Sequence, residues 1–130
     1  MAEPFDGKTI LIVDDDNDIL TAIEMAFKDT GVNILTAANG TTATTVAQEE
    51  SPDLLVLDAM LPQRSGFLVL EKLKAKKPRG SKPYVVMITG NTGKRHQAWA
   101  ESLGADDYIN KPFRMERLVE SVKNLLARDN

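Results

Sequence analysis

Short apolar runs alternate along this chain with longer stretches in which apolar residues recur every three or four positions. Three runs, at 9–13, 54–57 and 84–88, are apolar almost throughout, as expected of strands that are buried on both faces of a sheet. Two weaker runs lie at 32–37 and 107–109, and polar residues in the first of them favour a position at the sheet edge. The pattern therefore predicts five strands.

The stretches that follow these runs have the periodicity of helices. The last one is the most regular, with Met115, Leu118, Val122 and Leu125 on one face. The second contains four Thr residues, which are poor helix formers, and is the weakest. Ser65 can cap a helix that begins near residue 66. The predicted helices cover 16–28, 41–50, 67–77, 92–103 and 115–127.

Strands and helices thus alternate five times, which is the order of an α/β domain. Such an order predicts a parallel sheet with right-handed crossovers and with helices on both of its faces. A chain of 130 residues suits one hydrophobic core. We therefore expect a single domain over residues 1–130, with its core at about 8–127.

Composition excludes several classes of function. A net charge of −3 without a strongly basic face argues against direct nucleic-acid binding by this domain, and the basic stretch 76–83 fits a solvated loop. The chain has no Cys, so disulfides and thiolate metal sites are excluded. The longest apolar runs, about five residues, are far shorter than a membrane span. We expect a cytoplasmic protein without membrane contact.

Polar side chains follow four of the five predicted strands. Asp14 and Asp15 come directly after the first strand, Asp58 after the third, Thr89 at the end of the fourth and Lys111 after the fifth. Because the carboxyl ends of parallel strands meet at one edge of the sheet, we expect these side chains to converge there. Each residue alone has an ordinary explanation, such as a turn or a helix cap. Their occurrence together favours a site.

The residue types at this edge suit phosphoryl transfer. Three carboxylates in close proximity repel one another, and a hard cation such as Mg²⁺, bound through oxygen and water, relieves that repulsion. Lys111 supplies a positive charge and Thr89 a hydroxyl donor for anionic oxygens. A carboxylate acceptor, a metal, a cation and a donor are the usual components of phosphoryl transfer.

These motifs resemble those of the CheY-like receiver domains of bacterial two-component response regulators. The resemblance covers about residues 8–127 and implies a flavodoxin-like fold with strand order 2-1-3-4-5. The matching motifs are Val13-Asp14-Asp15, Asp58-Ala-Met-Leu-Pro62 with Gly66, Thr89-Gly90, Gly104-Ala-Asp-Asp-Tyr108 and Lys111-Pro112-Phe113.

The resemblance implies a role for each acidic residue. Asp58 would be the phosphoacceptor. Asp15 and Asp58 would ligate Mg²⁺ together with the backbone carbonyl of Met60, and Asp14 would act largely through water. The resemblance further implies that Mg²⁺ is the cofactor of the phosphorylation reaction.

It also implies roles for residues after the fourth and fifth strands. Thr89 and Lys111 would contact the phosphoryl group, and the bond between Lys111 and Pro112 would be cis. Tyr108 has two interpretations, either a core aromatic with its hydroxyl at the surface or the rotameric switch of the family. Asn91, two residues after Thr89, carries an amide that could position a water molecule.

The resulting hypothesis is a phosphorylation-controlled signalling module. It would receive its phosphoryl group from a phosphohistidine on a sensor histidine kinase or a histidine phosphotransfer protein, and it would be a substrate and switch, not an enzyme. An output protein or a second copy would bind the face formed by 92–103, 107–109 and 115–127. Trp99 lies in this region and is expected to pack with Leu103, while His96 is expected on a solvated helix face.

Two alternatives stay open at this point. One is a phosphate-independent interaction domain on the same fold, against which the complete set of polar residues argues. The other is a small Mg²⁺-dependent phosphatase of the haloacid-dehalogenase type, which also uses Asp. That class needs a second carboxylate two residues after the nucleophile, where this chain has Met60.

Overall fold

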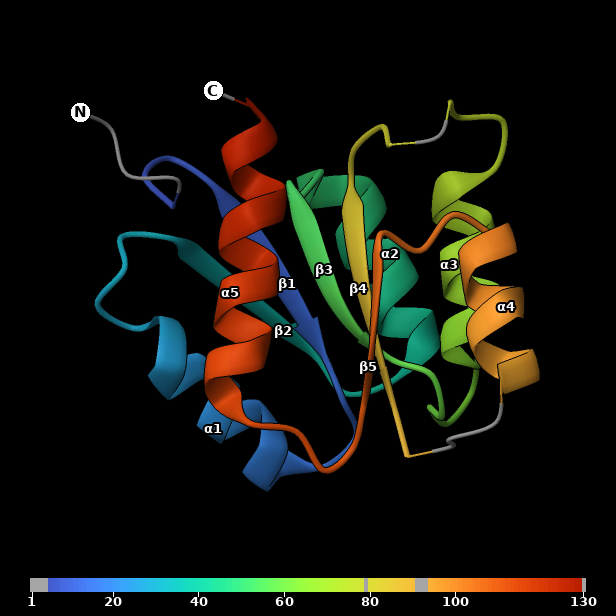
Figure 1. Cartoon of the computed structure of the whole chain (residues 1–130), viewed down its shortest axis with the longest axis horizontal. Coiled ribbons are helices and arrows are strands. Elements are labelled where there is room, and N and C mark those ends of the chain that lie inside the picture. The colour runs from blue at the N-terminus through green and yellow to red at the C-terminus, as the bar shows by residue number, and fades with distance from the viewer. Residues whose placement is uncertain (1–4, 79, 91–93, 130) are drawn as a thin grey trace.

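A computed structural model describes residues 5–78, 80–90 and 94–129 and shows one five-stranded sheet. All adjacent strands are parallel, and their order is β2-β1-β3-β4-β5 (Figure 1). This order confirms the predicted flavodoxin-like fold and places β2 at an edge. The strands are β1 (Thr9–Val13), β2 (Asn33–Ala37), β3 (Leu54–Asp58), β4 (Tyr84–Thr89) and β5 (Asp107–Asn110).

Helices cover both faces of this sheet. Residues of α1 and α5 pack on one face, and residues of α2, α3 and α4 pack on the other (Figure 1). None of the helices within the described residues is long and apolar enough to span a membrane. The helices are α1 (Asn17–Phe27), α2 (Gly40–Glu50), α3 (Gly66–Lys74), α4 (Lys94–Ser102), α5 (Met115–Leu126) and the 3-10 helix η1 (Ala127–Asp129).

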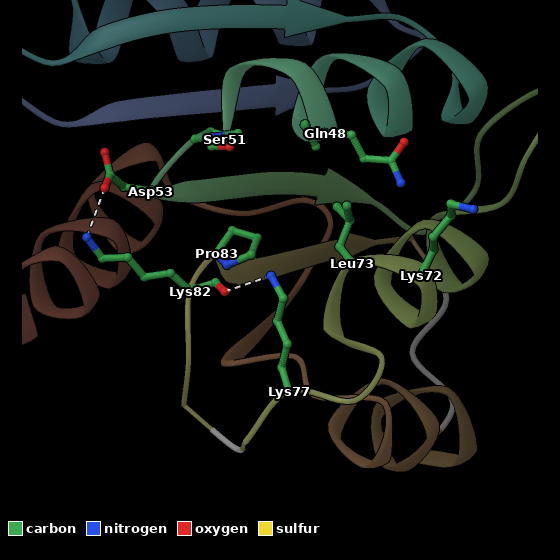
Figure 2. A pocket seen from close by; sticks show the side chains of 10 residues that line it. Gln48, Ser51, Asp53, Lys72, Leu73, Lys77, Lys82 and Pro83 are labelled. Carbon is green, nitrogen blue, oxygen red and sulfur yellow. Dashed lines mark hydrogen bonds and ion pairs between the residues drawn. The ribbon is translucent and has the colours of Figure 1, made fainter.

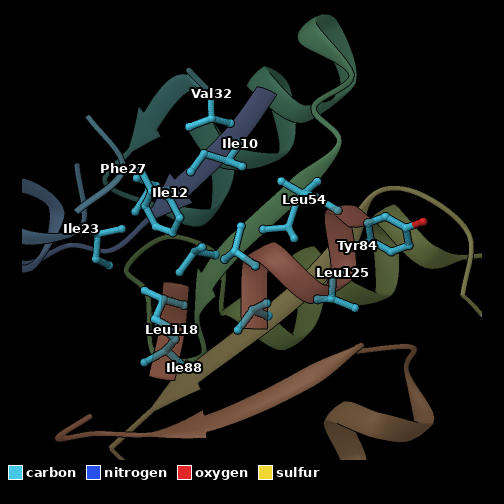
Figure 3. Packing of buried hydrophobic residues seen from close by; sticks show 14 of the residues in the cluster. Ile10, Ile12, Ile23, Phe27, Val32, Leu54, Tyr84, Ile88, Leu118 and Leu125 are labelled. Carbon is cyan, nitrogen blue, oxygen red and sulfur yellow. The ribbon is translucent and has the colours of Figure 1, made fainter. Parts of the chain in front are cut away.

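The core lies in two layers because successive strand residues point to opposite faces. Ile10 and Ile12 of β1 point towards α1 and α5, where they join Phe27 and Leu118 (Figure 3). Leu11 joins the second cluster on the other face. Each of these side chains is completely buried, which is worth roughly 1.5–3 kcal/mol per large apolar residue. The burial explains why β1 has no polar face in the sequence.

Side chains cap the first turns of α1 and α3, the helices that follow β1 and β3. Asp16 accepts a hydrogen bond from the backbone N–H of Asp18 at the start of α1, with an N···O distance of 2.9 Å. Ser65 caps α3 in the same way through the N–H of Leu68, at 3.3 Å, as predicted. These caps define where the chain leaves the carboxyl edge of the sheet.

One observed helix end differs from its prediction by more than one residue. The structure ends α3 at Lys74, three residues before the predicted end, because Ala75 is extended and Lys76 has a left-handed φ of 62°. The regular helix α4 is seen from Lys94 onward, and its predicted first residues lie outside the described residues. The earlier end of α3 moves no residue of the predicted site.

Trp99 has a stacking partner that was not predicted, and His96 is less exposed than predicted. Trp99 stacks face to face on Phe67 of α3, with ring centroids 4.3 Å apart and planes at 7°, although 46% of its surface stays exposed. The ring of His96 lies 5.8 Å from the same Phe67 and is half-buried, so its predicted solvated position is wrong. The stacked pair fastens α4 to α3.

Candidate functional site at the carboxyl edge of the sheet

The sheet register brings the predicted site residues to one edge. Val13 of β1 is level with Leu57 of β3, so Asp14 and Asp58 leave neighbouring strands at the same height. Oxygen atoms from the carboxylates of Asp14, Asp15 and Asp58 lie within 4.8 Å of one another. Asp14 and Asp58 are buried, at 2% and 5% exposure, whereas Asp15 is open to solvent. The predicted convergence of the acidic residues is therefore present.

Lys111 reaches the same cluster from the end of β5. Its Nζ lies 3.1 Å from Oδ2 of Asp14 and 3.3 Å from Oδ2 of Asp58. Burial alone would lower the pKa of Lys111, but the hydrogen bond to Asp14 and the charges of both carboxylates outweigh it, and the net shift is upward. The ammonium group is therefore held charged beside the acceptor. Three carboxylates facing one ammonium leave a formal charge of −2.

The protonation of Asp58 reflects opposing influences. Burial raises the pKa of its carboxyl, and the negative charge of Asp14 raises it further. The backbone N–H of Met60, 3.1 Å from Oδ1, and the ammonium of Lys111 act in the opposite sense, and the net shift is upward. The carboxylate of Asp58 is thus less stable in the folded domain than in water, which is a reason for this cluster to attract a cation.

The chain turns back tightly against Asp58 after β3. A Cβ atom on Gly66 would lie 2.1 Å from the carbonyl oxygen of Asp58, so no side chain fits at this position. The N–H of Gly66 donates to the carbonyl of Ala59 at 2.9 Å and closes the turn. The glycine of the predicted motif therefore has a steric function beside the acceptor.

Thr89 and Tyr108 lie on the last two strands of the sheet. Thr89 is buried at the carboxyl end of β4, at 1% exposure. The Tyr108 ring packs against the core, and its hydroxyl oxygen is buried without a partner in hydrogen-bond geometry among the described residues. The expectation of a surface hydroxyl is thus wrong. Burial raises the pKa of the Tyr108 phenol, and the nearby Thr89 side chain offsets part of that rise.

Two further predicted features, Met60 and the Lys111–Pro112 bond, adjoin residues of this cluster in the chain. The peptide bond between Lys111 and Pro112 is cis, and the Met60 side chain is 65% exposed beside the acceptor turn. A metal-binding role for the Met60 carbonyl stays a prediction, and Asn91 lies outside the described residues. All-oxygen donors, excess negative charge and an exposed Asp15 with room for water suit a hard divalent cation such as Mg²⁺.

A second ionic cluster, at the opposite edge of the sheet, was not predicted. Lys74 and Asp106 form an ion pair of 3.1 Å, with side chains only 5% and 6% exposed. Lys74 also donates to the carbonyl of Ser81 at 2.7 Å, and Asp106 accepts from the N–H of Val85 at 2.8 Å. The position of Lys74, four residues after Leu70 on the inward face of α3, is a sequence signal for its burial.

Another unpredicted ion pair fastens α5 to β5. Both guanidinium NH groups of Arg117 donate to the carboxylate of Asp107, at 2.9 and 3.1 Å, and the Ser121 hydroxyl donates to it at 2.5 Å. Burial would raise the pKa of Asp107, but these donors more than compensate and lower it. The pair fixes α5 next to Tyr108, within the face predicted to bind a partner.

A cavity of ≈ 480 Å³ lies away from the acidic cluster, near the starts of β3 and β4 (Figure 2). Lys72, Lys77 and Lys82 line it, but Lys82 pairs with Asp53 at 2.9 Å and Lys77 donates to a backbone carbonyl. The cavity contains none of the predicted site residues. The described residues that were predicted to take part in phosphoryl transfer therefore lie at the carboxyl edge and not in this cavity.

Comparisons with known proteins agree with this site. A family model described as the response regulator receiver domain matches residues 10–123. The chain is 38% identical over 120 residues to the probable transcriptional regulatory protein TcrX of Mycobacterium tuberculosis, covering 92% of this chain and 50% of TcrX. It is 36% identical over 122 residues to the alkaline phosphatase synthesis transcriptional regulatory protein PhoP of Bacillus subtilis, covering 94% and 50%. The chain thus spans about half the length of these relatives.

Solved structures give the same result. The receiver domain of the Francisella response regulator 1452 superposes with a TM-score of 0.86 at 25% identity, covering 95% of this chain and all of that one. A CheY-like receiver domain protein from Methanospirillum hungatei JF-1 superposes with a TM-score of 0.84 at 31% identity, covering 93% and 94%. With the family model and these relatives in agreement, the chain belongs to the response regulator receiver domain family.

Proposed function

We propose that this receiver domain accepts a phosphoryl group on Asp58 from a phosphohistidine of a sensor histidine kinase or histidine phosphotransfer protein. The observation that supports this most strongly is the buried Asp58 carboxylate, placed between an acidic pair and the ammonium of Lys111. An oxygen of Asp58 would attack phosphorus, the phosphorus–nitrogen bond would break, and the imidazole would leave with the bonding electrons. The product is an acyl phosphate, and no water is consumed.

The neighbouring side chains would each stabilise this transfer. Lys111 already contacts Asp58 and would remain beside the phosphoryl oxygens, where its charge offsets theirs. The Thr89 hydroxyl, buried at the next strand end, would donate to one of those oxygens. Thr89 ends β4 and Lys111 directly follows β5, so both groups would need only local movement when charge develops.

The site would work with Mg²⁺. Asp15 and Asp58 would hold the ion, with the backbone carbonyl of Met60 and with Asp14 acting through water. When bound, Mg²⁺ supplies positive charge to the phosphoryl oxygens and orients them for in-line transfer. The exposure of Asp15 leaves room for the water ligands that Mg²⁺ retains.

We infer that the domain is a switch in the cytoplasm, not an enzyme with a separate substrate. A phosphatase of the haloacid-dehalogenase type lacks support because Met60 stands where its second carboxylate is required. A phosphate-independent interaction domain has no use for a buried acceptor whose pKa is raised by burial and by Asp14. The domain would act on partner proteins without contacting membrane or nucleic acid directly.

The signal would pass from Thr89 to the face of α4, β5 and α5. Movement of Thr89 towards the phosphoryl group would change its influence on the buried Tyr108 hydroxyl and so reposition that ring. An output protein or domain, or a second copy of the chain, would bind this face. Two relatives are named transcriptional regulatory proteins and are about twice as long, which supports an output function in the whole protein.

Intact-mass measurement after incubation with acetyl phosphate and Mg²⁺ tests the acceptor. The parent should gain the mass of one phosphoryl group, labile to base as an acyl phosphate is, and Asp58→Asn should gain none. Asp106→Asn is a control, because that carboxyl is also buried but lies at the opposite edge. Stable labelling of Asp58→Asn at the level of the parent would refute the assignment.

The switch has a separate test. Thr89→Ala should still accept phosphate but should lose the effect of phosphate on self-association and partner affinity, a coupling of about 1–3 kcal/mol. Sedimentation of parent and variant, with and without phosphorylation, measures it. An equally strong response to phosphate in Thr89→Ala would contradict the Thr89 route.

A further inference from the structure

The loop that follows the acceptor strand, here called the acceptor loop (residues 59–65), rests against the first turn of α2. The N–H of Gly40 donates to the carbonyl of Pro62 at 3.3 Å, and the N–H of Arg64 donates to the same carbonyl at 2.8 Å. A Cβ on Gly40 would lie 1.9 Å from the carbonyl oxygen of Arg64. The two backbones are therefore in direct contact.

A buried hydroxyl group completes this contact. The guanidinium of Arg64 donates to Oγ1 of Thr44 at 3.4 Å, and Thr44 in turn donates to the carbonyl of Gly40 at 2.9 Å. Thr44 is 4% exposed, so its hydroxyl has little access to water. Pro62, Gly40, Thr44 and Arg64 thus form a closed ring of hydrogen bonds between the acceptor loop and α2.

The geometry of this loop affects the acceptor directly. Met60, two residues before the ring, donates its N–H to Oδ1 of Asp58. Gly66, just after the ring, lies against the Asp58 carbonyl with no space for a side chain. Between these two contacts, Gln63 has a left-handed φ of 68°, which a non-glycine residue keeps only when its surroundings hold it. The ring supplies that restraint.

We propose that Arg64 is a positioning residue, which acts through Thr44 and Gly40 of α2 to hold the Met60 amide on the acceptor carboxylate. This inference rests on the proposed function, because it concerns the rate at which Asp58 takes up a phosphoryl group. Among the hydrogen bonds and ion pairs of the described residues, none joins Arg64 to Asp58, so Arg64 acts through the loop. A partner that displaced the first turn of α2 would, by the same route, slow phosphorylation.

Two readouts on one set of variants test the proposal. The first is the backbone amide shift of Met60 by NMR in the metal-free protein, and the second is the initial rate of phosphorylation by acetyl phosphate at saturating Mg²⁺. Arg64→Ala and Thr44→Val should each move the Met60 amide and slow phosphorylation by roughly 10-fold, because a displacement of about 1 Å costs about 100-fold and a smaller displacement should cost less. Thr44→Ser, which keeps the hydroxyl, should restore both.

Thr45→Val is the matched control. The Thr45 hydroxyl also donates to the carbonyl four residues earlier, that of Thr41, at 3.2 Å, but Thr45 is exposed, and the guanidinium hydrogen bond found among the described residues goes to Thr44. This variant should leave both readouts unchanged. The double variant Arg64→Ala with Thr44→Val should be no slower than the slower single variant, because both changes open the same ring.

The outcomes separate this inference from the proposed function. If the parent accepts no phosphoryl group, the proposed function fails, while the Met60 amide still reports on the ring. If Arg64→Ala is folded and leaves the Met60 amide in place, or if Thr45→Val has the same effects as Thr44→Val, the positioning role of Arg64 is wrong.

Discussion

The carboxyl ends and the amino ends of the strands form two opposite edges of the sheet, and each edge has a contact between a lysine and a buried aspartate. The two contacts differ in their balance of charge. At one edge, Lys74 and Asp106 pair one to one at 3.1 Å, and each of them also has a hydrogen bond to a backbone group. At the other, Lys111 lies 3.1 Å from Asp14 and also faces two further carboxylates. The first cluster is neutral, and the second keeps a formal charge of −2.

This difference indicates which cluster is structural and which one binds a ligand. A neutral pair whose partners are also hydrogen-bonded to the backbone gains little from an added ion. An unmatched cluster stays unfavourable until a cation or a proton arrives, and the raised pKa of Asp58, caused first by burial, is consistent with such a state. The expected consequence is that substitutions have opposite effects on stability at the two edges.

The largest change in stability is expected at the edge with the neutral Lys74–Asp106 pair, here called the balanced edge. Lys74→Met removes one partner and leaves the Asp106 carboxylate buried and unpaired, so the free energy of unfolding should fall by about 3–5 kcal/mol. Denaturant unfolding at neutral pH measures it. Lys72→Met, at an exposed position of the same helix, is the control and should change stability by less than about 0.5 kcal/mol. Equal losses in both variants would contradict a structural role for the pair.

A smaller change in stability, of opposite sign, is expected at the carboxyl edge, where the negative charges are unmatched. Asp58→Asn removes a carboxylate that is repelled by Asp14, so without metal it should raise the free energy of unfolding by on the order of 1 kcal/mol at pH 7. Because the pKa of Asp58 is raised in the folded state, its penalty is fully present above that raised pKa. The penalty disappears as the pH falls below the ordinary Asp value of 3.8.

The increase in the free energy of unfolding caused by Asp58→Asn should therefore become smaller as the pH is lowered. Urea unfolding of parent and variant across this pH range, in the presence of a chelator, measures the difference. Asp106→Asn should instead be destabilised, because the same change at the balanced edge breaks a matched pair. Destabilisation of both variants at pH 7 would remove the distinction between the edges.

The sequence was sufficient to predict the unmatched cluster at the carboxyl edge. It was not sufficient to predict the neutral pair at the opposite edge. Asp14, Asp58 and Lys111 each follow a strand, and strand ends in a parallel sheet necessarily meet. Lys74 and Asp106 lie at a helix end and before a strand, where the relative placement depends on how α3 packs on the sheet. Periodicity gives the inward face of a helix, but it does not identify the partner of a buried charge.

The hydroxyl of Tyr108 and the acceptor loop show the same limit. The hydroxyl of an aromatic residue on a strand can point inward or outward, and the packing of the Tyr108 ring against the buried cluster decides between them. The contact between Arg64 and Thr44 joins residues twenty positions apart on a loop and a helix, for which the sequence has no periodic signal. Side-chain contacts between different elements could therefore be identified only from the structure.

The most direct test of the central claim is the dependence of stability on Mg²⁺. An ion that binds the native state alone at a concentration equal to its Kd should raise the free energy of unfolding of the parent by about 0.4 kcal/mol, and by more at higher concentration. Asp15→Asn should lose most of this increase, whereas Asp18→Asn, on the exposed first turn of α1, should keep it. An Mg²⁺ response of Asp15→Asn equal to that of the parent would contradict the assignment of this edge as the metal and phosphoryl site.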